Sequence, residues 1–521
     1  MLRGESRQPV NGAEVRLLTG DGPFFSGARV MTTGEDGRFV FTNVGPGTYR
    51  IYVVATGYAS QEYKQNSPGA GGAPLSVAVG QTLKDVTISL SPTGAIVGRV
   101  SEDSGEPAVG IPVQLFRTLF LPTGKSYQGV ASTTADDRGH YRLFGLVPGQ
   151  YYLAVGRQVD PRRLQVEKGQ IGNDIRGYAF RLYPGVSNVN QAVLIEVRPG
   201  TELTMDMKAV RRQTYVVRGT VIDPETGLPR GRINLSLVDR SLTGGGATVP
   251  IPDYYSSTGA FEVSVPPGDY ILVASMHVLD DAARAAGEAA WAVFPTARVP
   301  ITVVDEDLQD IALTLKRPSA LTGVVRVDGQ ASAGQVRIAL EPFEDVAGRA
   351  TTIGNAGNDG RFQVLGVLPG NYSVMVQYFP RNLYVRSIRY EGMDILNQPL
   401  QFSGSVNGEI EIVLDPDVAQ LSGTVLNAQS RPVSGSTAML LPDQRSRKDL
   451  YRSIVSDQNG RFILSDLAPG DYKIFAWEAL ELSFTFDPDF IRQFEQQGKR
   501  VHIEKSRNDS VDVQVIGTAF R

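Results

Sequence analysis

The 521-residue sequence contains no cysteine and no long apolar run. Without cysteine the chain cannot form disulfide bonds, thiolate metal sites or a cysteine nucleophile. A membrane-spanning helix needs about 18 apolar residues in succession, and no stretch comes near that length. An excess of one charge is missing too, because 51 Lys and Arg residues face 55 Asp and Glu residues, for a net charge of −4. These absences predict a chain without disulfides, without a membrane span and without a nucleic-acid partner.

Histidine and the usual catalytic motifs are also scarce. The three histidines, His140, His277 and His502, lie far apart in the chain, whereas a zinc peptidase needs clustered histidines and carboxylates. There is no Gly-x-Ser-x-Gly elbow, no phosphate-binding loop and no dinucleotide fingerprint. The acidic runs at 136–137 and 305–307 are interpreted as solvated turn residues, because glycoside hydrolysis needs two carboxylates facing each other across a cleft. We therefore predict no enzyme, with no catalytic, cofactor-binding or metal-binding residues.

Glycine and proline, in contrast, are abundant, with 56 and 31 residues. Some of them belong to a phrase that occurs five times: a turn, then Gly, a variable residue, an aromatic residue and, farther on, Pro-Gly-x-Tyr. The first glycines of successive copies lie 102, 120, 101 and 100 residues apart. The five copies consist of Gly37, Phe39, Pro46, Gly47 and Tyr49; Gly139, Tyr141, Pro148, Gly149 and Tyr151; Gly259, Phe261, Pro267, Gly268 and Tyr270; Gly360, Phe362, Pro369, Gly370 and Tyr372; and Gly460, Phe462, Pro469, Gly470 and Tyr472.

Each part of the phrase favours β-structure. Asp or Asn before the first glycine is typical of tight hairpins, in which glycine accepts a positive φ. The residues that follow alternate between apolar and polar, as in a half-buried strand, and Pro-Gly suits the centre of a type II turn. A second phrase, Gly-x-Val, opens the later repeats at Gly98, Gly219, Gly323 and Gly423. Short strands at this density, separated by turns, predict antiparallel β-sandwiches.

The repeats divide the chain into five expected domains, with boundaries near Pro92, Arg212, Arg317 and Pro416. The predicted sandwiches span residues 1–92, 93–212 (with an inserted loop at 157–184), 213–317, 318–416 and 417–521. The first repeat lacks its Gly-x-Val opening and begins midway through a strand, so we expect an N-terminal truncation that has removed upstream sequence such as a signal peptide. An alternative start codon is the other explanation.

The linkers between these repeats are short and not rich in Gly and Ser, which favours a semi-rigid string of domains. An extended string of five would reach about 150–200 Å. Helix is predicted only for residues 281–291, which are rich in alanine, and for residues 487–497, where Asp487-Pro488 forms a helix start.

The paired phrases Gly-x-Val and Gly-Arg-Phe…Pro-Gly-x-Tyr resemble the carboxypeptidase regulatory-like domain. The resemblance covers nearly the whole chain in five tandem copies, cleanest in the fourth and fifth and weakest in the third, which has Ala260 after its first glycine. It implies a transthyretin-like, seven-stranded all-β sandwich related to the B-type repeats of collagen-binding adhesins and to starch-binding-like domains. It also implies a non-catalytic role and a secreted or cell-envelope location in a bacterium. Some adhesin repeats carry a lysine–asparagine crosslink, but the corresponding first strands here contain no lysine.

Binding residues are sought in the loops, where sandwich domains commonly carry recognition. The insertion at 157–184 supplies possible ligand contacts, in which aromatic faces stack on sugar rings and guanidinium groups donate hydrogen bonds: Tyr178, Phe180, Tyr183, Arg176 and Arg181. The alternative is that these aromatics form a strand edge that packs locally. The turns at 355–360 and 457–459 are rich in oxygen ligands, but they lack the spacing of a calcium-binding EF-hand loop. Trp477 is interpreted as a packing or domain-contact residue.

Three functions remain open from the sequence. The first is a non-enzymatic structural or interaction protein of the cell envelope or exterior, whose sandwiches form a spacer and binding rod with a polysaccharide or an envelope protein as partner. The second is a carbohydrate-binding array. The third is the accessory region of a larger enzyme whose catalytic domain lies upstream.

Overall fold

The regular secondary structure in the described part of the chain is almost entirely β-strand. The computed structural model describes residues 2–4, 8–19, 28–66, 69–122, 124–156, 178–211, 213–240, 248–251, 253–277, 295–328, 335–342, 351–403, 406 and 408–517. Within these ranges the one α-helix is α3 (Pro488–Phe494), accompanied by three short 3-10 helices. The predicted all-β fold is confirmed, and the strands form successive two-sheet sandwiches.

The strands fall into five successive groups, which we call the first to fifth units. The first unit contains β1 (Leu2–Gly4), β2 (Glu14–Thr19), β3 (Arg29–Thr32), β4 (Gly47–Val54), β5 (Gln61–Glu62), β6 (Leu75–Val77) and β7 (Ile88–Leu90). The second contains β8 (Gly94–Ser101), β9 (Pro112–Leu121), β10 (Gly124–Thr134), β11 (His140–Leu146), β12 (Gly149–Val155), β13 (Arg181–Leu182), η1 (Val189–Gln191), β14 (Ile195–Val197), β15 (Glu202–Thr204) and β16 (Met207–Lys208).

The third unit contains β17 (Tyr215–Ile222), β18 (Arg232–Asp239), β19 (Thr248–Pro250), β20 (Asp253–Tyr255), β21 (Ala260–Val265), β22 (Gly268–His277), β23 (Thr296–Val303) and β24 (Leu308–Thr314). The fourth contains β25 (Ser319–Val327), β26 (Arg337–Pro342), β27 (Thr352–Asn355), β28 (Arg361–Val367), β29 (Gly370–Gln377), β30 (Tyr384–Tyr390), β31 (Met393–Asp394), β32 (Leu400–Phe402) and β33 (Glu409–Asp415).

The fifth unit contains β34 (Ala419–Leu426), β35 (Thr437–Pro442), η2 (Lys448–Leu450), β36 (Arg452–Val455), β37 (Arg461–Leu467), β38 (Gly470–Trp477), η3 (Leu482–Phe486), α3, β39 (Lys499–Ile503), β40 (Asn508–Ser510) and β41 (Val513–Ile516). Within the described residues the first unit shows seven strands, the number that the family resemblance implies, and the later units show additional short ones. The domain boundaries near Pro92, Arg212, Arg317 and Pro416 remain a prediction.

The second to fifth units share one strand arrangement. The opening strand, which carries Gly-x-Val, pairs antiparallel with the strand of the Gly-x-aromatic phrase and parallel with a closing strand. In the fourth unit, for example, β25 lies between β28 and β33. The strand that follows Pro-Gly belongs to the opposite sheet, where β29 pairs with β26 and β32. The two recurring phrases therefore form the central part of one sheet and the entry to the other.

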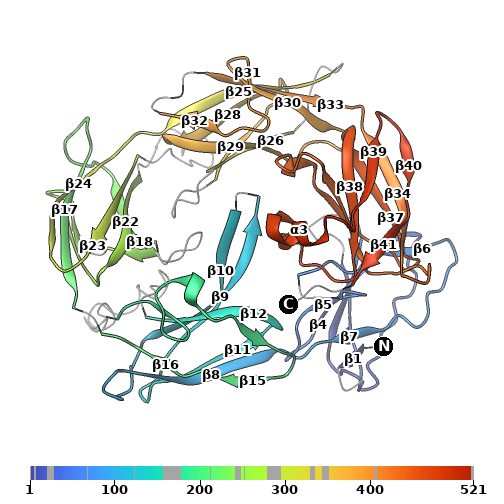
Figure 1. The fold of residues 1–521 in the computed structure, drawn as a ribbon, viewed down its shortest axis with the longest axis horizontal. Helices are drawn as coiled ribbons and strands as arrows, with labels where there is room; N and C mark the ends of the chain where they lie inside the picture. Colours follow the sequence, from blue (N-terminus) through green and yellow to red (C-terminus); the bar gives the residue numbers. More distant parts are fainter. Residues whose placement is uncertain are drawn as a thin grey trace.

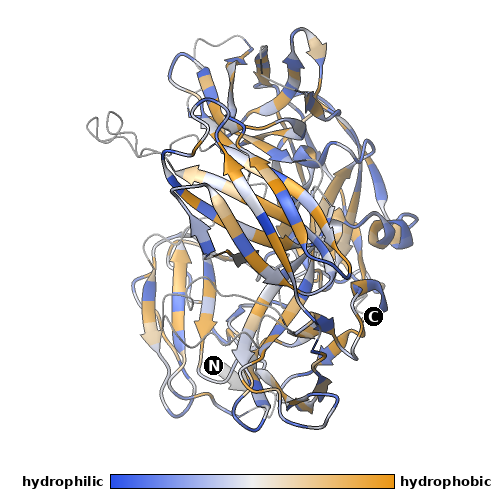
Figure 2. Ribbon diagram, turned by 90° about the vertical axis from the view of Figure 1, so that its left-hand side faces the viewer, coloured by the Kyte–Doolittle hydropathy of each residue, from blue (hydrophilic) through white to orange (hydrophobic). Residues whose placement is uncertain are grey.

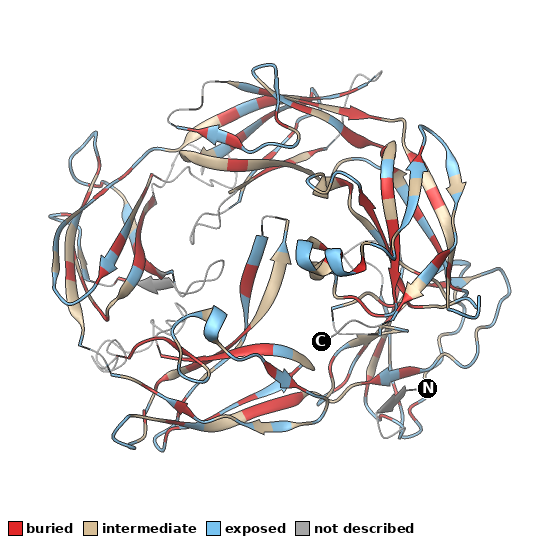
Figure 3. Ribbon diagram, viewed as in Figure 1, coloured by how far each residue is buried: buried red, intermediate tan, exposed pale blue. Residues whose placement is uncertain are grey.

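Alternating side chains fill the space between the two sheets of each unit. Figure 2 shows apolar and polar residues alternating along the strands, and Figure 3 shows buried positions interspersed with exposed ones along many of them. Each unit has its own hydrophobic cluster. Tyr384 of the fourth unit lies in the cluster of the fifth, so these two units share part of a core.

The units follow one another around a closed ring, with the first beside the fifth (Figure 1). The expectation of an extended rod is therefore wrong. Short linkers do limit the freedom between neighbours, but they fix no straight direction, and contacts between the two ends of the chain decide the shape. Within the ring, β9 and β10 of the second unit extend toward the centre and meet the fifth unit.

The predicted helix at the Asp487-Pro488 start is confirmed as α3. The Asp487 side chain accepts a hydrogen bond from the backbone N–H of Asp489 at 3.0 Å, which satisfies an otherwise free donor of the first turn. The predicted helix at 281–291 lies outside the described residues. No helix of the described part is long and apolar enough to cross a membrane.

Candidate functional site

The tyrosine of Pro-Gly-x-Tyr has the same structural role in all five units. Its hydroxyl donates to the backbone carbonyl four residues earlier and so holds the Pro-Gly turn against the start of the next strand. The acceptors are Gly45 for Tyr49 (2.9 Å), Val147 for Tyr151, Pro266 for Tyr270 (2.8 Å), Leu368 for Tyr372 (2.8 Å) and Ala468 for Tyr472 (2.8 Å). Burial raises the pKa of Tyr472 to about 12, so the hydroxyl stays a donor over the whole physiological range.

The glycine of Gly-x-Val lies directly opposite the aromatic residue of the other phrase. Gly423 pairs with Phe462 in the β34–β37 ladder, and the same pairing joins Gly98 with Tyr141 in the second unit. A Cβ at Gly423 would lie 1.8 Å from the carbonyl oxygen of Val511 and 2.7 Å from the ring of Phe462. Only glycine leaves room for the ring and the closing segment together, which explains why the two phrases recur as a pair.

The aspartates before the first glycine of the phrase are occupied by the turn itself. Asp359 accepts the backbone N–H of Arg361 at 3.1 Å, and Asp457 accepts those of Asn459 and Arg461 at 2.8 Å each. Such side-chain-to-backbone bonds favour Asp in turns without any metal. In the part of the chain that the structure describes, no three His, Asp or Glu residues gather in a way that could hold a metal ion.

The histidines do not come together either. His140 is exposed on β11, and Nδ1 of His502 lies 2.7 Å from a carboxylate oxygen of Asp471 on the surface of the fifth unit. The side chain of His277 lies outside the described residues.

The residues predicted as ligand contacts in the second unit are largely buried. Tyr178 is 2% exposed, Phe180 9% and Arg181 8%, whereas Tyr183 is half-buried and Arg176 lies outside the described residues. The described members of this set therefore do not form the exposed platform that sugar stacking needs, and they pack locally as the alternative reading expected. The alternation in the sequence could not distinguish an exposed binding segment from a locally packed strand, because successive side chains of this segment are buried in two different hydrophobic clusters.

Tyr178 belongs to a polar network at the end of the second unit. Its hydroxyl donates to Glu102, and Nε of Arg211 donates to the same carboxylate at 2.9 Å. The guanidinium also lies over the Tyr178 ring, 5.2 Å from its centroid. These interactions lower the pKa of Glu102, with the Tyr178 hydrogen bond as the largest cause. The network ties the last residues of the second unit to its first strand.

Trp477 packs in a second hydrophobic cluster on the outer face of the β35–β38 sheet. Its ring stacks on Phe475 with centroids 5.2 Å apart, and Phe494 of α3 meets it edge-on at 5.8 Å. Beside this cluster, Phe484 of η3 contacts Phe120 of β9 with centroids 5.4 Å apart. Lys448 donates to the carbonyl of Pro122 in the same hairpin. The helix-bearing face of the fifth unit thus holds the second unit, and Trp477 is a packing residue, as the sequence suggested.

The first and fifth units meet through polar contacts that close the ring. The side-chain amide of Asn66 donates to the carbonyls of Gly435 at 3.2 Å and Glu478 at 2.7 Å. The amide of Gln458 accepts from the backbone N–H of Ser76 and donates to its carbonyl, both at 3.2 Å. None of these residues belongs to a recurring phrase, so no sequence pattern indicates the contact.

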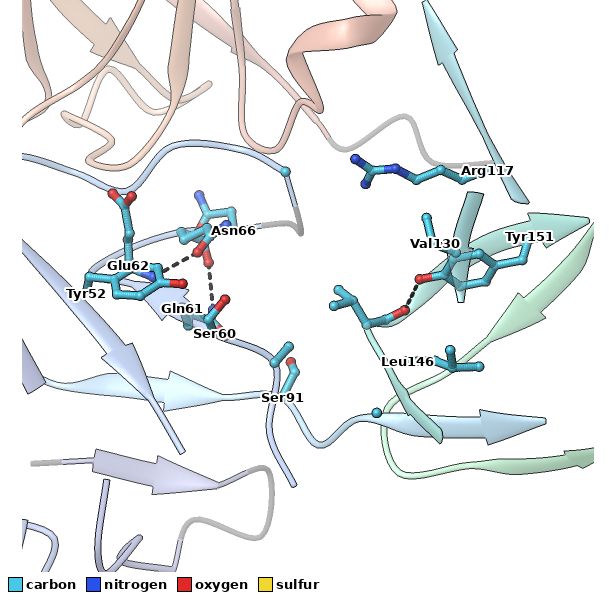
Figure 4. Close-up of a pocket in the computed structure, with 15 residues that line it drawn as sticks. Tyr52, Ser60, Gln61, Glu62, Asn66, Ser91, Arg117, Val130, Leu146 and Tyr151 are labelled. Atoms are coloured by element: carbon cyan, nitrogen blue, oxygen red, sulfur yellow. Dashed lines mark hydrogen bonds between the residues drawn. The ribbon is translucent and has the colours of Figure 1, made fainter. Parts of the chain in front are cut away.

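A cleft of about 340 Å³ lies between the first and second units (Figure 4). Its first-unit wall is mostly polar, and its second-unit wall is mostly apolar. The lining residues are Tyr52, Ala59, Ser60, Gln61, Glu62, Gln65, Asn66, Gly69 and Ser91 of the first unit with Arg117, Val130, Gly145, Leu146, Val147 and Tyr151 of the second. A crevice between two domains is a usual place for a ligand. Sequence reasoning missed it because it exists only where two repeats meet.

Electrostatically the cleft combines a free guanidinium edge with a neutralised carboxylate. Nε of Arg117 donates to Gln128 at 3.1 Å, and Figure 4 shows the guanidinium extending over the cleft. Glu62 lies in a half-buried ion pair with Arg50 at 2.5 Å and also accepts the N–H of Gly72. Burial raises the pKa of Tyr151. The nearby charge of Arg117 opposes that shift, and the charge of Glu481 adds to it.

The successive β-sandwiches, with the same tyrosine hydrogen bond at the Pro-Gly turn of each unit, define a modular protein of mainly β-structure. The sequence model of the carboxypeptidase regulatory-like domain matches residues 1–91. The interpretation of the later units as further copies of this domain rests on the recurring phrases.

No curated protein matches the sequence. Among solved structures, GBS52, the minor pilin of Streptococcus agalactiae, is 15% identical, with 39% of this chain and 84% of that chain covered and a TM-score of 0.21. BcpA, the major pilin subunit of Bacillus cereus, is 13% identical, with 81% and 99% covered and a TM-score of 0.16. The RrgB pilus protein of Streptococcus pneumoniae is 8% identical, with 82% and 99% covered and a TM-score of 0.15. At such identities and scores the likeness does not extend to function.

Proposed function

We propose that this chain is a non-enzymatic interaction scaffold of the bacterial cell exterior or envelope, whose sandwiches are closed into a ring. The observation that carries the proposal is the use of every recurring residue for structure. The tyrosine hydroxyls, phrase glycines and turn aspartates are all engaged in holding turns and strands, as Tyr472 with Ala468 and Gly423 with Phe462 illustrate. The residues that recur therefore form the framework of the units, and the residues that differ between units are available for recognition.

Contacts between units support the closed form of this scaffold. The fifth unit touches the first through Asn66 and Gln458 and the second through Phe484. Residues that lie more than 300 positions apart in the chain are thereby fixed relative to one another. A ring of rigid units presents its outer loops and its clefts between units in a fixed arrangement, which suits a partner in the envelope better than a flexible tether would.

A designed disulfide tests the closure because the natural chain has no cysteine. A Cβ added at Gly71 would lie 3.0 Å from Cγ2 of Val455, the position that a cysteine sulfur takes. The pair Gly71→Cys and Val455→Cys is therefore within reach of disulfide geometry across the junction of the first and fifth units. A matched control combines Val455→Cys with Val304→Cys, an exposed residue of the third unit.

Under mild oxidation of a dilute sample, we expect the first pair to form an internal disulfide. On a non-reducing gel this loop of several hundred residues shifts the monomer band, and the control pair leaves it unshifted. Absence of the internal crosslink, together with a maximum dimension near the rod length of about 150–200 Å in small-angle scattering, would refute the closed scaffold. A hydrolytic or transferase activity of the purified chain would refute the non-enzymatic role.

A further inference from the structure

The cleft between the first and second units has two chemically different walls. On the second-unit side, Val130 and Val147 are partly exposed, at 40% and 38%, and lie beside the buried Leu146. Val130 stands at the irregularity in the β9–β10 ladder between Gly129 and Ala131, where a β-bulge turns its side chain out of the regular alternation. On the opposite side the wall consists of hydroxyl and amide groups, among them Ser60 and Gln61.

The polar wall is held rigid by its own hydrogen bonds. Gln61 donates to the carbonyl of Gln65 at 3.0 Å, Gln65 accepts the N–H of Glu62 at 2.8 Å, and the Gln65 amide donates to Ala70 at 2.8 Å. Asn66 is fixed from outside by its bonds to the fifth unit. A ligand would meet amide groups that are already ordered, which lowers the entropy that binding costs.

Charge distinguishes the kind of ligand. The carboxylate of Glu62 is compensated by Arg50, so it does not repel an anion. Arg117 uses its Nε for Gln128, and its two terminal nitrogens make no hydrogen bond within the described residues. They form the guanidinium edge that reaches over the cleft in Figure 4. A guanidinium edge with two parallel N–H donors matches a carboxylate.

We propose that this cleft binds one or two residues of an acidic polysaccharide. The apolar face of a uronic acid ring lies against Val130 and Leu146, its hydroxyl groups bond to Ser60 and Gln61, and its carboxylate pairs with Arg117. The volume of about 340 Å³ admits a segment of this size and excludes a folded partner. This proposal rests on the scaffold function proposed above, to which it adds one class of ligand.

The experiment is affinity electrophoresis of the full chain through gels that contain polygalacturonate or alginate, with dextran as the neutral polymer. Two variants change the charge of the second-unit wall: Arg117→Gln removes the positive charge, and Val130→Asp adds a negative one at an exposed position. Val130→Asn controls for the change in size and polarity without charge. Arg361→Gln removes an arginine of similar type on the surface of the fourth unit, whose one ion pair is weak at 3.9 Å.

We expect retardation by at least one of the two acidic polymers and little by dextran. Arg117→Gln and Val130→Asp should raise the apparent dissociation constant by about tenfold or more, Val130→Asn should raise it less than Val130→Asp, and Arg361→Gln should leave it unchanged. Equal retardation of all variants, retardation only by dextran, or no retardation by either acidic polymer would overturn the proposal. The disulfide test of the ring does not depend on this cleft, so the two proposals can fail separately.

Discussion

The side-chain amide of Gln458 pairs with the backbone of Ser76 as a neighbouring β-strand would, accepting its N–H and donating to its carbonyl at 3.2 Å each. Two units that are nearly 400 residues apart in the chain are thus joined through main-chain groups of the first. Because a side-chain amide can satisfy both groups at once, the contact is specific in geometry although it is exposed to solvent.

The first prediction concerns this junction. The double variant Asn66→Ala and Gln458→Ala removes four hydrogen bonds between the first and fifth units, each worth about 0.5–1.5 kcal/mol at most in an exposed setting. We expect the ring to open part of the time, which raises the maximum dimension in small-angle scattering. Substitution of exposed Gln429, which lies at a turn of the same unit, should leave the scattering curve unchanged. Identical curves for the double variant would show that these four hydrogen bonds are not needed to keep the ring closed.

The second prediction concerns the tyrosine hydroxyls. Tyr472→Phe removes a buried hydrogen bond to Ala468 and leaves that carbonyl without its side-chain donor, so we expect the fifth unit to lose about 1–2 kcal/mol of unfolding free energy. Tyr49→Phe should cost the first unit less, because its bond to Gly45 is exposed to water. Chemical denaturation followed by Trp477 fluorescence in a Trp291→Phe background reports the fifth unit, and hydrogen exchange of peptides from the first unit, which contains no tryptophan, reports that unit. Equal small effects at both positions would contradict the role of burial.

A third prediction addresses the glycine beneath the aromatic ring. Gly423→Ala places a methyl group 1.8 Å from the Val511 carbonyl and 2.7 Å from Phe462, and both neighbours are held by the sheet. We expect a loss of about 3 kcal/mol or more in the stability of the fifth unit, or failure of that unit to fold. Gly517→Ala is the control, since nothing lies within 4 Å of the added methyl group. The same denaturation experiment measures both, and a cost below about 1 kcal/mol for Gly423→Ala would contradict the close approach.

The fold could be predicted from the sequence because its causes are local and repeated. A hairpin dipeptide, period-two alternation and Pro-Gly each fix a few residues, and their recurrence at about one hundred residues fixes the architecture. The helix start at Asp487-Pro488 is equally local. Even the tyrosine hydrogen bond had a signal, namely the constant spacing of tyrosine from the Pro-Gly turn, although the acceptor four residues back became evident only in the structure.

The ring and the cleft could not be predicted because they depend on single residues without a pattern. Asn66 and Gln458 look like ordinary surface amides in the sequence, and Arg117 looks like one of many strand arginines. The segment around Tyr178 could not be interpreted from the sequence for a related reason. A cluster of aromatic residues in an insertion has the same sequence pattern whether its side chains are exposed or buried. Here Glu102 and Arg211, which come from distant positions in the chain, contact Tyr178.

The last prediction follows from that network and depends on pH. The pKa of Glu102 in the folded chain is lowered from its usual value of 4.5, chiefly by the hydrogen bond from Tyr178 and also by Arg211. A carboxyl group with a lowered folded pKa stabilises the fold above its unfolded pKa, and this stabilisation is lost as the pH falls through the folded pKa. The contribution of Glu102 should therefore be complete at pH 7 and should decline below about pH 4.5.

Melting temperatures of the natural chain and of Glu102→Gln measured between pH 7 and pH 3 test this sign. The natural chain should melt at a higher temperature at pH 7, and the difference should shrink steadily as the solution is acidified, because protonation removes from the natural chain the charge that the variant already lacks. Glu106→Gln is the matched control: it changes a nearby glutamate of the same turn that shows no such network, and its difference from the natural chain should stay small at every pH. A difference for Glu102→Gln that grows toward low pH would mean that the carboxylate is disfavoured in the fold, which the short contacts of Tyr178 and Arg211 with it do not allow.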